Sequence, residues 1–567
     1  MPAIGFEGCL AEIGLNEGGG ADGEGGLGEI RGRRSRPPIT NQCCDDSRSG
    51  CDFEQFAATK DVAVKTCIRR NPKPLMEICM TQTNAATASA PAQPAAEGQS
   101  VALPRSLSTL RLAVFVIAAV APLACVIGVL PVALVFGSGT ALPLAFVVST
   151  VVTALFAVGY SAFSREVLVG GAFYTYIARG LGPVTGLGAA GVAVVSYTMF
   201  VPGGFSYLGY MMQTTFSDLL GFHLHWVVYS LTAWVIIGFF GLRQIDFSAR
   251  VVLFVILIEF MLLLFFDAIL VGELGSAAFP AQSLDIGGLT TGAPGVAILL
   301  AFTCYFGIES AALFSEEAKS PQKSVARATY IAIFTIGIFY FVTSWITVGA
   351  IGPDNIKGIP DADVGLIYFK LSNQYVSGAF TTVIQVALVT SMFATVLSMH
   401  NVAARYLFVL GRQGCLPRVL GRAHPVHGSP SAASATVSVV ALVVFTSAAY
   451  LGLHPMLGLG LIVLGFAAVG VMFMQALTSL AVVSYFRKHP ERHLWQHVIA
   501  PILAFVGLLG ALYFAVTNFE YLSGSQNPVI NRFPIGIILA MAAGIGFGLW
   551  LRRYRPARFA AIQLDDS

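Results

Sequence analysis

The sequence predicts an all-α integral membrane protein that crosses the bilayer many times. Hydrophobic residues make up 56% of its 567 residues and charged residues only 11%, and its mean hydropathy is +0.74. A soluble domain carries roughly 25% charged residues. Apolar runs of membrane-spanning length also recur between residues 105 and 555, so a single anchoring helix does not account for the composition.

The first 104 residues have a different composition from the rest. They are rich in Gly, Glu, Ala and Arg, and they include an Ala/Pro/Gln-rich run at 85–94. Such a segment buries too little apolar surface to offset the entropy lost on ordering, so we expect residues 1–104 to be disordered. Met80 precedes a short polar lead-in to the first apolar run, and we favour a misassigned start at Met80 over a regulatory tail.

The cysteines do not predict a metal site. Six of the nine lie before residue 80, namely Cys9, Cys43, Cys44, Cys51, Cys67 and Cys79. A zinc site usually takes paired, closely spaced cysteine or histidine ligands, and Cys43-Cys44 followed by Cys51 matches that spacing poorly. We therefore expect no metal and no cofactor. Nucleic acid is not an expected partner either, because no basic surface with interleaved aromatic residues occurs outside short loops.

Twelve segments between residues 105 and 555 meet the requirement of a membrane helix, which is about 20 mostly apolar residues. They are Arg111–Phe136, Ala141–Ser161, a run inside Pro183–Phe216, Trp226–Gly241, Val251–Val271, Gly292–Leu313, Ala328–Ile351, Val376–Ala404, Ser434–Leu453, Met456–Tyr485, Val498–Val516 and Phe533–Leu551. Residues 556–567 follow as a short tail.

Lysine and arginine are distributed unequally between the loops on the two sides of the membrane. The loops after the even-numbered segments contain 18 of them, whereas the opposite loops contain three: Lys357, Lys370 and Arg532. Cytoplasmic loops are the ones enriched in these residues. We therefore expect both termini in the cytoplasm and the protein in the cell membrane.

The sixth segment contains the most informative residues. Its apolar run, which begins at Gly295, meets a glycine and a carboxylate at Gly307 and Glu309. A charge at membrane depth is costly and usually faces a cavity on a substrate or ion path, and helices interrupted at that depth are typical of secondary transporters. The alternative is a helix that ends near Phe306 with Glu309 in water, although apolar residues continue to Phe314.

Four stretches of the chain resemble the amino acid–polyamine–organocation permeases. Residues 164–182 resemble their arginine, glycine-pair and aromatic-pair signature before span three, and residues 241–250 resemble their entry to span five. Residues 302–328 are similar to their span-six signature, and residues 401–417 resemble their exit from span eight. The four stretches occur in the family's order over the whole apolar part of the chain.

The resemblance implies two inverted repeats of five helices each, followed by two further helices. It also implies that spans one and six are unwound at a substrate site, to which spans three, eight and ten add side chains. In span one the family usually has a Gly-Ser-Gly-Ile-Phe-like run, whereas this chain has Ala121-Pro-Leu-Ala-Cys-Val-Ile-Gly128. Pro122 can still interrupt the helix, because proline lacks an amide donor and clashes with the preceding turn.

The expected substrate-binding residues lie in these two interrupted helices and in span three. They are Pro122, Ala124, Cys125 and Gly128 in span one, Cys304, Tyr305, Phe306, Gly307 and Glu309 in span six, and Tyr197 in span three. Gly307 has the alternative role of a close-packing contact between helices. Tyr207 and Tyr210 are further candidates in span three, although an aromatic residue on a packed helix usually belongs to the core.

Glu259 is the expected coupling residue. It lies about 12 Å into the fifth segment, where the resemblance places the buried lysine of proton-coupled relatives. Burial disfavours the charged form of a carboxylate, so a proton can bind there; the alternative is a structural glutamate. Asp267, further along the same helix, is expected to face an outer vestibule or the headgroups, and His400 to be a structural histidine.

These residues predict a secondary active transporter of an amino acid or related amine, working by alternating access and coupled to protons. Its expected partners are a small-molecule substrate, a proton and the lipid bilayer. No Walker motif occurs, so ATP is not the direct energy source. The alternatives are a sodium-coupled carrier, an exchanger or a transport-dead sensor. An enzyme is not expected, because the segments contain no His-Glu-x-x-His helix and no clustered nucleophile and base.

A protein truncated to begin at Met80 is expected to fold and transport as the full chain does, because residues 1–79 contain none of the twelve segments. Thermal unfolding and uptake into proteoliposomes compare the two forms, and N-terminal sequencing identifies the start that is used. A clear loss of uptake in the truncated form would show that the extension is both made and needed.

Overall fold

The computed structural model describes residues 108–166, 172–243, 249–309, 321–424, 428–487, 493–523 and 527–564. The chain divides into two units, residues 1–100 and 101–567, and all described residues lie in the second. The predictions for residues 1–104 and Met80 lie outside the described residues. So do the glycine pair of residues 170–171 and part of the similarity around residues 241–250.

The described residues form helices and no strands. The first half contains α3 (Thr109–Val120), α4 (Pro122–Ala124), α5 (Leu130–Ala133), α6 (Leu142–Glu166), α7 (Ala172–Leu181), α8 (Pro183–Leu220), α9 (Trp226–Arg243), α10 (Ala249–Leu274), α11 (Ile286–Leu289) and α12 (Pro294–Thr303). The second half contains α14 (Pro321–Ile351), α15 (Ile367–Tyr375), α16 (Gly378–Arg412), α17 (Ser431–Tyr450), α18 (Leu461–Phe486), α19 (Ala500–Thr517), α20 (Phe519–Ser523), α21 (Pro528–Asn531), α22 (Ile535–Tyr554) and α23 (Pro556–Leu564).

Short turns of tighter or wider helix connect several of these elements. The wider, π-helical turns are η1 (Cys125–Val129), η2 (Leu134–Ser138), η9 (Pro455–Gly460) and η10 (Trp495–Ile499). The tighter, 3-10 turns are η3 (Gly139–Ala141), η4 (Gly275–Ala278), η5 (Ala281–Leu284), η7 (Pro353–Gly358) and η8 (Asp361–Leu366).

Ten helical stretches of the described residues are long and apolar enough to cross a membrane. One of them, Pro122–Glu166, contains most of the first predicted segment and all of the second, and the backbone leaves the helical conformation between them at Gly137. The sixth predicted segment corresponds to α12, which has only 10 residues. The other nine stretches match the remaining predictions in order. The all-helical, multi-pass chain is thus confirmed, whereas the count of twelve and the inverted repeat stay predictions.

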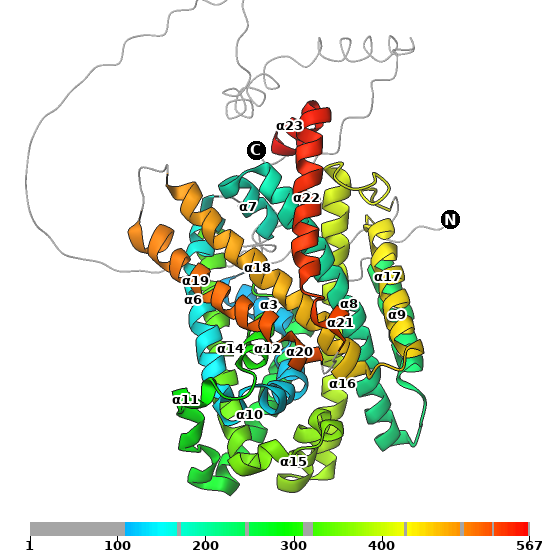
Figure 1. The fold of residues 1–567 in the computed structure, drawn as a ribbon. Helices are drawn as coiled ribbons and strands as arrows, with labels where there is room; N and C mark the ends of the chain where they lie inside the picture. The colour runs from blue at the N-terminus through cyan, green and yellow to red at the C-terminus, as the bar shows by residue number, and fades with distance from the viewer. Residues whose placement is uncertain are drawn as a thin grey trace, which may run out of the picture. The chain divides into compact units, whose positions relative to one another are not determined.

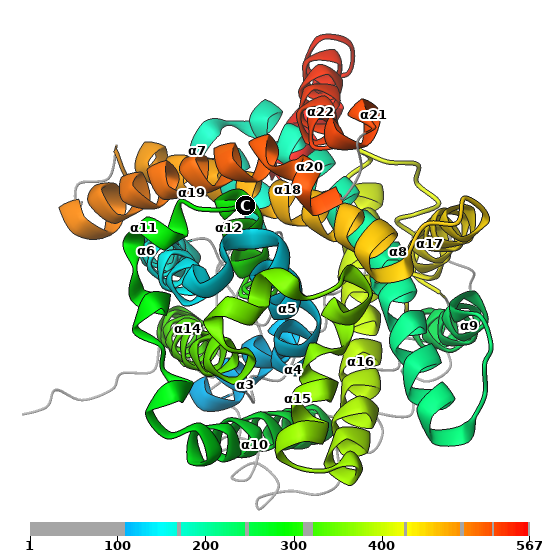
Figure 2. The same cartoon turned by 60° about the horizontal axis from the view of Figure 1, so that its bottom comes forward.

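The interrupted first helix lies in the middle of the bundle. Figure 2 shows α3, α4 and α5 surrounded by α14, α10, α15, α16 and α8, and α12 packs directly on α5. Every residue from Ala121 to Leu134 is buried. The interrupted segment is therefore enclosed by other helices on all sides, where its apolar side chains pack against theirs.

The outer helices show the opposite pattern. In Figure 1, α9 and α17 lie side by side along one flank of the bundle, and each exposes large apolar side chains, among them Val235 and Val443. The same is true of α22, where Ile538 and Leu539 are exposed. Extended apolar faces of this kind mark contact with lipid or protein. The exposed apolar faces of these outer helices therefore agree with a protein embedded in a bilayer.

Candidate functional site

The first helix is interrupted where Pro122 predicts it. Helix α3 ends at Val120, and Ala121 adopts a left-handed conformation with φ 52° and ψ 71°. No other non-glycine among the described residues has a positive φ. This conformation costs a residue with a Cβ roughly 1–2 kcal/mol, and such strain is concentrated at functional sites. The sequence places no glycine here to relieve it.

Polar groups at this first break are satisfied by an unusual set of partners. The Cys125 amide donates to the Ala121 carbonyl at 3.1 Å, and the Cys125 thiol donates to the Val120 carbonyl at 3.3 Å. The carboxyl group of Glu259 lies near the amide of Leu123, at the start of α4. A distant acidic side chain therefore lies at the N-terminus of the helix that resumes after the break, where acids are favoured.

Glu259 connects three elements at this point. The residue, carried by α10, is only 3% exposed, and its carboxyl group also lies near the Ser391 hydroxyl of α16. Asp267 differs from the expectation that it faces a vestibule or the headgroups, because it is 6% exposed and accepts a hydrogen bond from Thr343 of α14 at 2.6 Å. Helix α10 thus presents two buried carboxyl groups to the bundle, with Glu259 against the break.

The α-helix of the sixth segment stops before Gly307, and residues 310–320 lie outside the described part of the chain. Helix α12 ends at Thr303, and residues 304–309 continue as turns rather than as α-helix. The Tyr305 amide donates to the Phe302 carbonyl at 2.9 Å, and Gly307 has a φ of 108°. An L side chain rarely adopts that conformation, whereas glycine does so at little steric cost. The glycine is therefore required by the shape of the break.

Glu309 is buried just beyond this turn. It is 4% exposed, so the alternative that it lies in water does not hold. Its carboxylate accepts hydrogen bonds from the Tyr197 hydroxyl of α8 at 2.5 Å and from the Gly307 amide at 3.1 Å. The Tyr160 hydroxyl of α6 donates to its backbone carbonyl at 3.2 Å. These bonds fix the break in span six to two neighbouring helices.

Four aromatic side chains pack together beside Glu309. Tyr197 stacks on Tyr406 of α16 with ring centroids 4.9 Å apart, and Phe306 meets Tyr197 edge to face at 5.4 Å. Phe200 packs on Phe306 at 5.2 Å. Aromatic pairs at these distances add about 0.5–1.5 kcal/mol each beyond their burial. We call Tyr197, Phe200, Phe306 and Tyr406 the aromatic layer.

A cavity of about 80 Å³ lies between the two breaks, next to the aromatic layer. Its wall comes from span one, α8, span six, α16 and the start of α18. The lining residues are Val120, Ala121, Ala124, Cys125, Gly128, Val129, Phe200, Gly203, Gly204, Tyr207, Thr303, Phe306, Met392, Thr395, Val396, Met399, Met456, Gly460, Leu461 and Leu464. None of these side chains is charged, and three of them are methionines, which adapt readily to irregular apolar groups.

The residues expected from the sequence divide into two groups. Ala124, Cys125, Gly128 and Phe306 line the cavity. Pro122, Cys304, Tyr305, Gly307, Glu309 and Tyr197 lie outside its lining. Some residues of the second group affect the cavity indirectly. Pro122 and Gly307 determine the backbone conformation of the two breaks, and Tyr197 contacts both Glu309 and the lining residue Phe306.

Tyr207 is the one of the three tyrosine candidates in span three that lines the cavity. Its hydroxyl is buried and has no hydrogen-bond partner among the described residues, so it is free to bond a substrate. The ring lies against Gly128, where any Cβ would collide with the hydroxyl. The sequence Pro202-Gly203-Gly204 could have identified this face of span three, because small residues allow helices to approach closely in membranes. Both glycines line the cavity.

One end of the cavity wall is positioned by a histidine in a loop. The Nδ1 atom of His454 accepts hydrogen bonds from the amides of Met456 and Leu457, at 3.2 and 3.1 Å, and so begins the turn η9. Burial lowers the pKa of His454, which agrees with a neutral ring whose nitrogen accepts. Met456 in turn lines the cavity.

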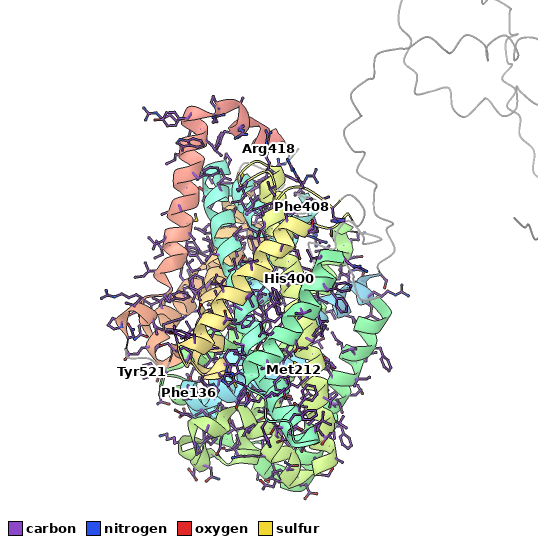
Figure 3. The ribbon with its side chains drawn as sticks, turned by 90° about the vertical axis from the view of Figure 1, so that its right-hand side faces the viewer. Phe136, Met212, His400, Phe408, Arg418 and Tyr521 are labelled. Carbon is purple, nitrogen blue, oxygen red and sulfur yellow. The ribbon has the colours of Figure 1, made fainter. Side chains whose placement is uncertain are left out.

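His400 lies apart from the cavity, as expected of a structural histidine. Figure 3 shows it on α16 between Met212 toward one end of the bundle and Arg418 toward the other. It is fully buried, and its Nε2 atom bonds the Ser438 hydroxyl of α17 at 2.9 Å. Among the described residues, no group of three or more His, Cys, Asp or Glu side chains could hold a metal ion.

Comparisons with known proteins give a consistent set of similarities. Residues 107–543 match the sequence model of a family described as amino acid permease. The chain is 24% identical over 318 residues to the branched-chain amino acid permease of Bacillus subtilis (strain 168), covering 52% of this chain and 65% of that protein. It therefore spans less than two thirds of that relative.

Two further relatives have different names. The methylthioribose transporter of Bacillus subtilis (strain 168) is 23% identical over 419 residues, covering 70% of this chain and 84% of that protein. The low-affinity putrescine importer of Escherichia coli (strain K12) is 26% identical over 321 residues, covering 53% of this chain and 66% of that protein.

Proposed function

Because the chain belongs to the amino acid permease family and is a multi-pass membrane protein, we propose that it is a proton-coupled secondary transporter of a neutral amino acid with an apolar side chain. It works by alternating access, with twelve helices in the inverted-repeat arrangement and both termini in the cytoplasm. The observation that carries this proposal is the cavity at the two breaks, whose lining includes no charged side chain.

A free amino acid brings two opposite charges, which must be paired when they leave water. Interrupted helices supply those partners through the amides and carbonyls that lose their helical bonds. Cavity-lining Val120, Ala121 and Thr303 belong to the two breaks. The apolar wall around Met392, Met399 and Leu464 then receives the side chain of the substrate.

The relatives' printed substrates differ in how well they fit this wall. Putrescine has an ammonium group at each end, and each of them needs a negatively charged partner. The lining has no carboxylate, and both carboxylate oxygens of the nearby Glu309 already accept hydrogen bonds. Methylthioribose carries several hydroxyls, whereas the polar lining side chains are few. A branched-chain amino acid satisfies the apolar wall best, so this class is the favoured substrate.

The aromatic layer is proposed to act as the gate on one side of the cavity. It can open only if the stacked rings of Tyr197 and Tyr406 separate, and the bond from Tyr197 to Glu309 resists this movement. Glu259 is proposed to bind and release the coupling proton. Because its carboxyl group lies near the Leu123 amide at the first break, a change in its charge would act on the segment that holds the substrate.

Uptake of radiolabelled leucine into proteoliposomes tests this function. Accumulation above equilibrium is expected when the outside is more acidic, and excess unlabelled isoleucine or valine should compete whereas putrescine should not. Sodium-dependent uptake that ignores the pH gradient would favour the sodium-coupled alternative. Exchange without net accumulation would favour an exchanger, and binding without uptake would favour a sensor.

Tyr207→Phe is expected to raise KM roughly ten- to a hundredfold with little change in maximal rate. A hydrogen bond to a charged substrate group contributes about 1.5–3 kcal/mol, and about 1.4 kcal/mol corresponds to a tenfold change in affinity. The phenylalanine ring keeps the contact with Gly128. Initial uptake rates over a range of leucine concentrations measure the change.

Tyr210→Phe is the matched control, because Tyr210 lies on the same helix, does not line the cavity and packs on His454. Its KM is expected to equal that of the unmodified protein. An unchanged KM in Tyr207→Phe would remove Tyr207 from the binding site.

A further inference from the structure

A second pocket lies at one end of the bundle and shares no residue with the cavity between the two breaks. It has a volume of about 480 Å³, and its walls come from the junction of α7 with α8 and from α22 and α23. Figure 1 shows α7, α22 and α23 at this same end. The lining residues are Leu181, Gly182, Pro183, Val184, Arg552 and Phe559. Among these six residues only Arg552 is charged.

The pocket lies directly beyond a close contact between α8 and α22. A Cβ on Gly544 would lie 2.4 Å from the Leu187 carbonyl oxygen, and a Cβ on Gly548 would lie 3.4 Å from the Cα of Val184. Gly544, Gly548 and Arg552 are spaced by four residues, so they follow one another along the same face of α22. The two glycines let the helices approach closely, and the arginine on the next turn faces the pocket together with Val184.

Helix α23 forms another part of the wall. It packs on α22, and its Phe559 contacts the apolar pair Leu187 and Leu551. The pocket therefore has an apolar wall that is fixed by contacts among three helices, with the guanidinium of Arg552 at its edge.

Arginines gather at this end of α22 and on α23. They are Arg552, Arg553, Arg555 and Arg558, and all four are exposed. None of them forms an ion pair with a described residue, since the ion pair within the described ranges joins Lys370 to Asp363. Positions 521–564 contain no acidic residue, and Asp565 and Asp566 follow after the described residues. A cluster of arginines directly after a spanning helix is typical of a site for anionic lipids.

The part of α22 next to the arginines has the surface of a helix at the membrane boundary. Leu549, Trp550 and Tyr554 are exposed, and the guanidinium carbon of Arg553 lies 5.6 Å from the centroid of the Tyr554 ring. Tryptophan and tyrosine are enriched at the level of the lipid headgroups. A ligand with a charged head at the pocket and apolar chains beside α22 would therefore match both parts of this surface.

We propose that the pocket binds the headgroup of an anionic phospholipid, whose phosphate contacts Arg552 and whose acyl chains lie along the exposed apolar face of α22. The planar guanidinium of arginine matches the geometry of a phosphate group. A soluble phosphate ion would use the same arginine but would leave the apolar face of α22 uncovered, so the lipid is the occupant that satisfies the whole surface. This inference does not depend on the substrate or on the coupling ion.

The experiment uses the full chain, purified in a neutral detergent and titrated with dioleoyl phosphatidylglycerol. Native mass spectrometry counts the bound lipids, and thermal unfolding measures their effect on stability. Dioleoyl phosphatidylcholine has the same acyl chains without net charge and tests the headgroup. Inorganic phosphate tests whether a soluble anion suffices.

We expect saturable binding of phosphatidylglycerol and a higher midpoint of thermal unfolding, because a ligand that binds the folded state stabilises it. Phosphatidylcholine and inorganic phosphate should give neither effect. Arg552→Gln is expected to weaken the binding roughly tenfold, as the loss of a hydrogen bond to a charged group does. Arg243→Gln is the matched control, because Arg243 is an exposed arginine at the end of α9 and does not line the pocket.

Four results would overturn the proposal. Arg552→Gln could bind phosphatidylglycerol like the unmodified protein, or Arg243→Gln could lose as much affinity, which would indicate a diffuse effect of charge rather than a site. Equal binding of phosphatidylcholine, or displacement of the lipid by inorganic phosphate, would exclude a site for an anionic phospholipid. A lipid-free dimer that Arg552→Gln converts to a monomer would assign this surface to a second copy of the chain. Loss of leucine uptake bears on the proposed function and leaves these binding measurements unaffected.

Discussion

Glu259→Gln is expected to abolish accumulation driven by a pH gradient while largely sparing exchange of substrate across the membrane. Glutamine has nearly the same size, and it keeps an oxygen that can accept from the Leu123 amide and the Ser391 hydroxyl near this position. It cannot take up or release a proton. A gradient of one pH unit stores about 1.4 kcal/mol per proton, which supports roughly tenfold accumulation at one proton per substrate. The variant should accumulate nothing above equilibrium.

Two variants on the same helix make this result specific. Glu273 is exposed on α10, so Glu273→Gln should accumulate substrate normally and controls for the loss of a carboxylate. Asp267→Asn tests the second buried carboxyl group, whose partner is Thr343. If Asp267→Asn abolishes the response to pH and Glu259→Gln does not, the coupling site has been assigned to the wrong carboxylate. Normal accumulation in both Glu259→Gln and Asp267→Asn would show that neither buried carboxyl group of α10 binds the coupling proton.

The sequence predicts the elements of this fold well, because the membrane imposes a simple rule on them. A spanning helix needs about 20 apolar residues, so apolar runs alone locate most of the helices. Both breaks were also predictable. Proline cannot donate an amide bond, and a glycine near a carboxylate is out of place in a lipid-facing helix. Pro122 lies directly after the end of α3 and its strained residue Ala121, and Gly307 lies in the turn that follows α12.

What the sequence could not predict is how each helix is rotated about its axis. The choice between Tyr197 and Tyr207 depends on which side of α8 faces Gly128, a contact between distant parts of the chain. The burial of Asp267 likewise depends on Thr343, which belongs to another helix. Three methionines on α16 and η9 contribute to the apolar wall of the cavity. The sequence does not distinguish a methionine that lines a cavity from one that packs in the core or faces lipid.

Gly307→Leu is expected to eliminate uptake in protein that reaches the membrane at normal levels. Gly307 has a φ of 108°, and holding a residue with a Cβ in such a region costs about 1–3 kcal/mol. Leucine also has a much higher helix propensity than glycine, so the turn at 304–309 would tend to become helical. Either change moves the Gly307 amide away from Glu309, to which it donates at 3.1 Å. The aromatic layer would then lose the support that Glu309 gives it through Tyr197.

Gly510→Leu is the matched control for this substitution. Gly510 lies in the regular helix α19, and a Cβ there would meet no atom within 4 Å, so the added side chain should enter open space without changing uptake. Surface labelling and a thermal unfolding curve show whether each variant is present and folded. Gly307→Ala should lie between the two, since it adds the conformational strain with little bulk. If Gly307→Leu transports at the rate of Gly510→Leu, the interrupted sixth span is not part of the transport mechanism.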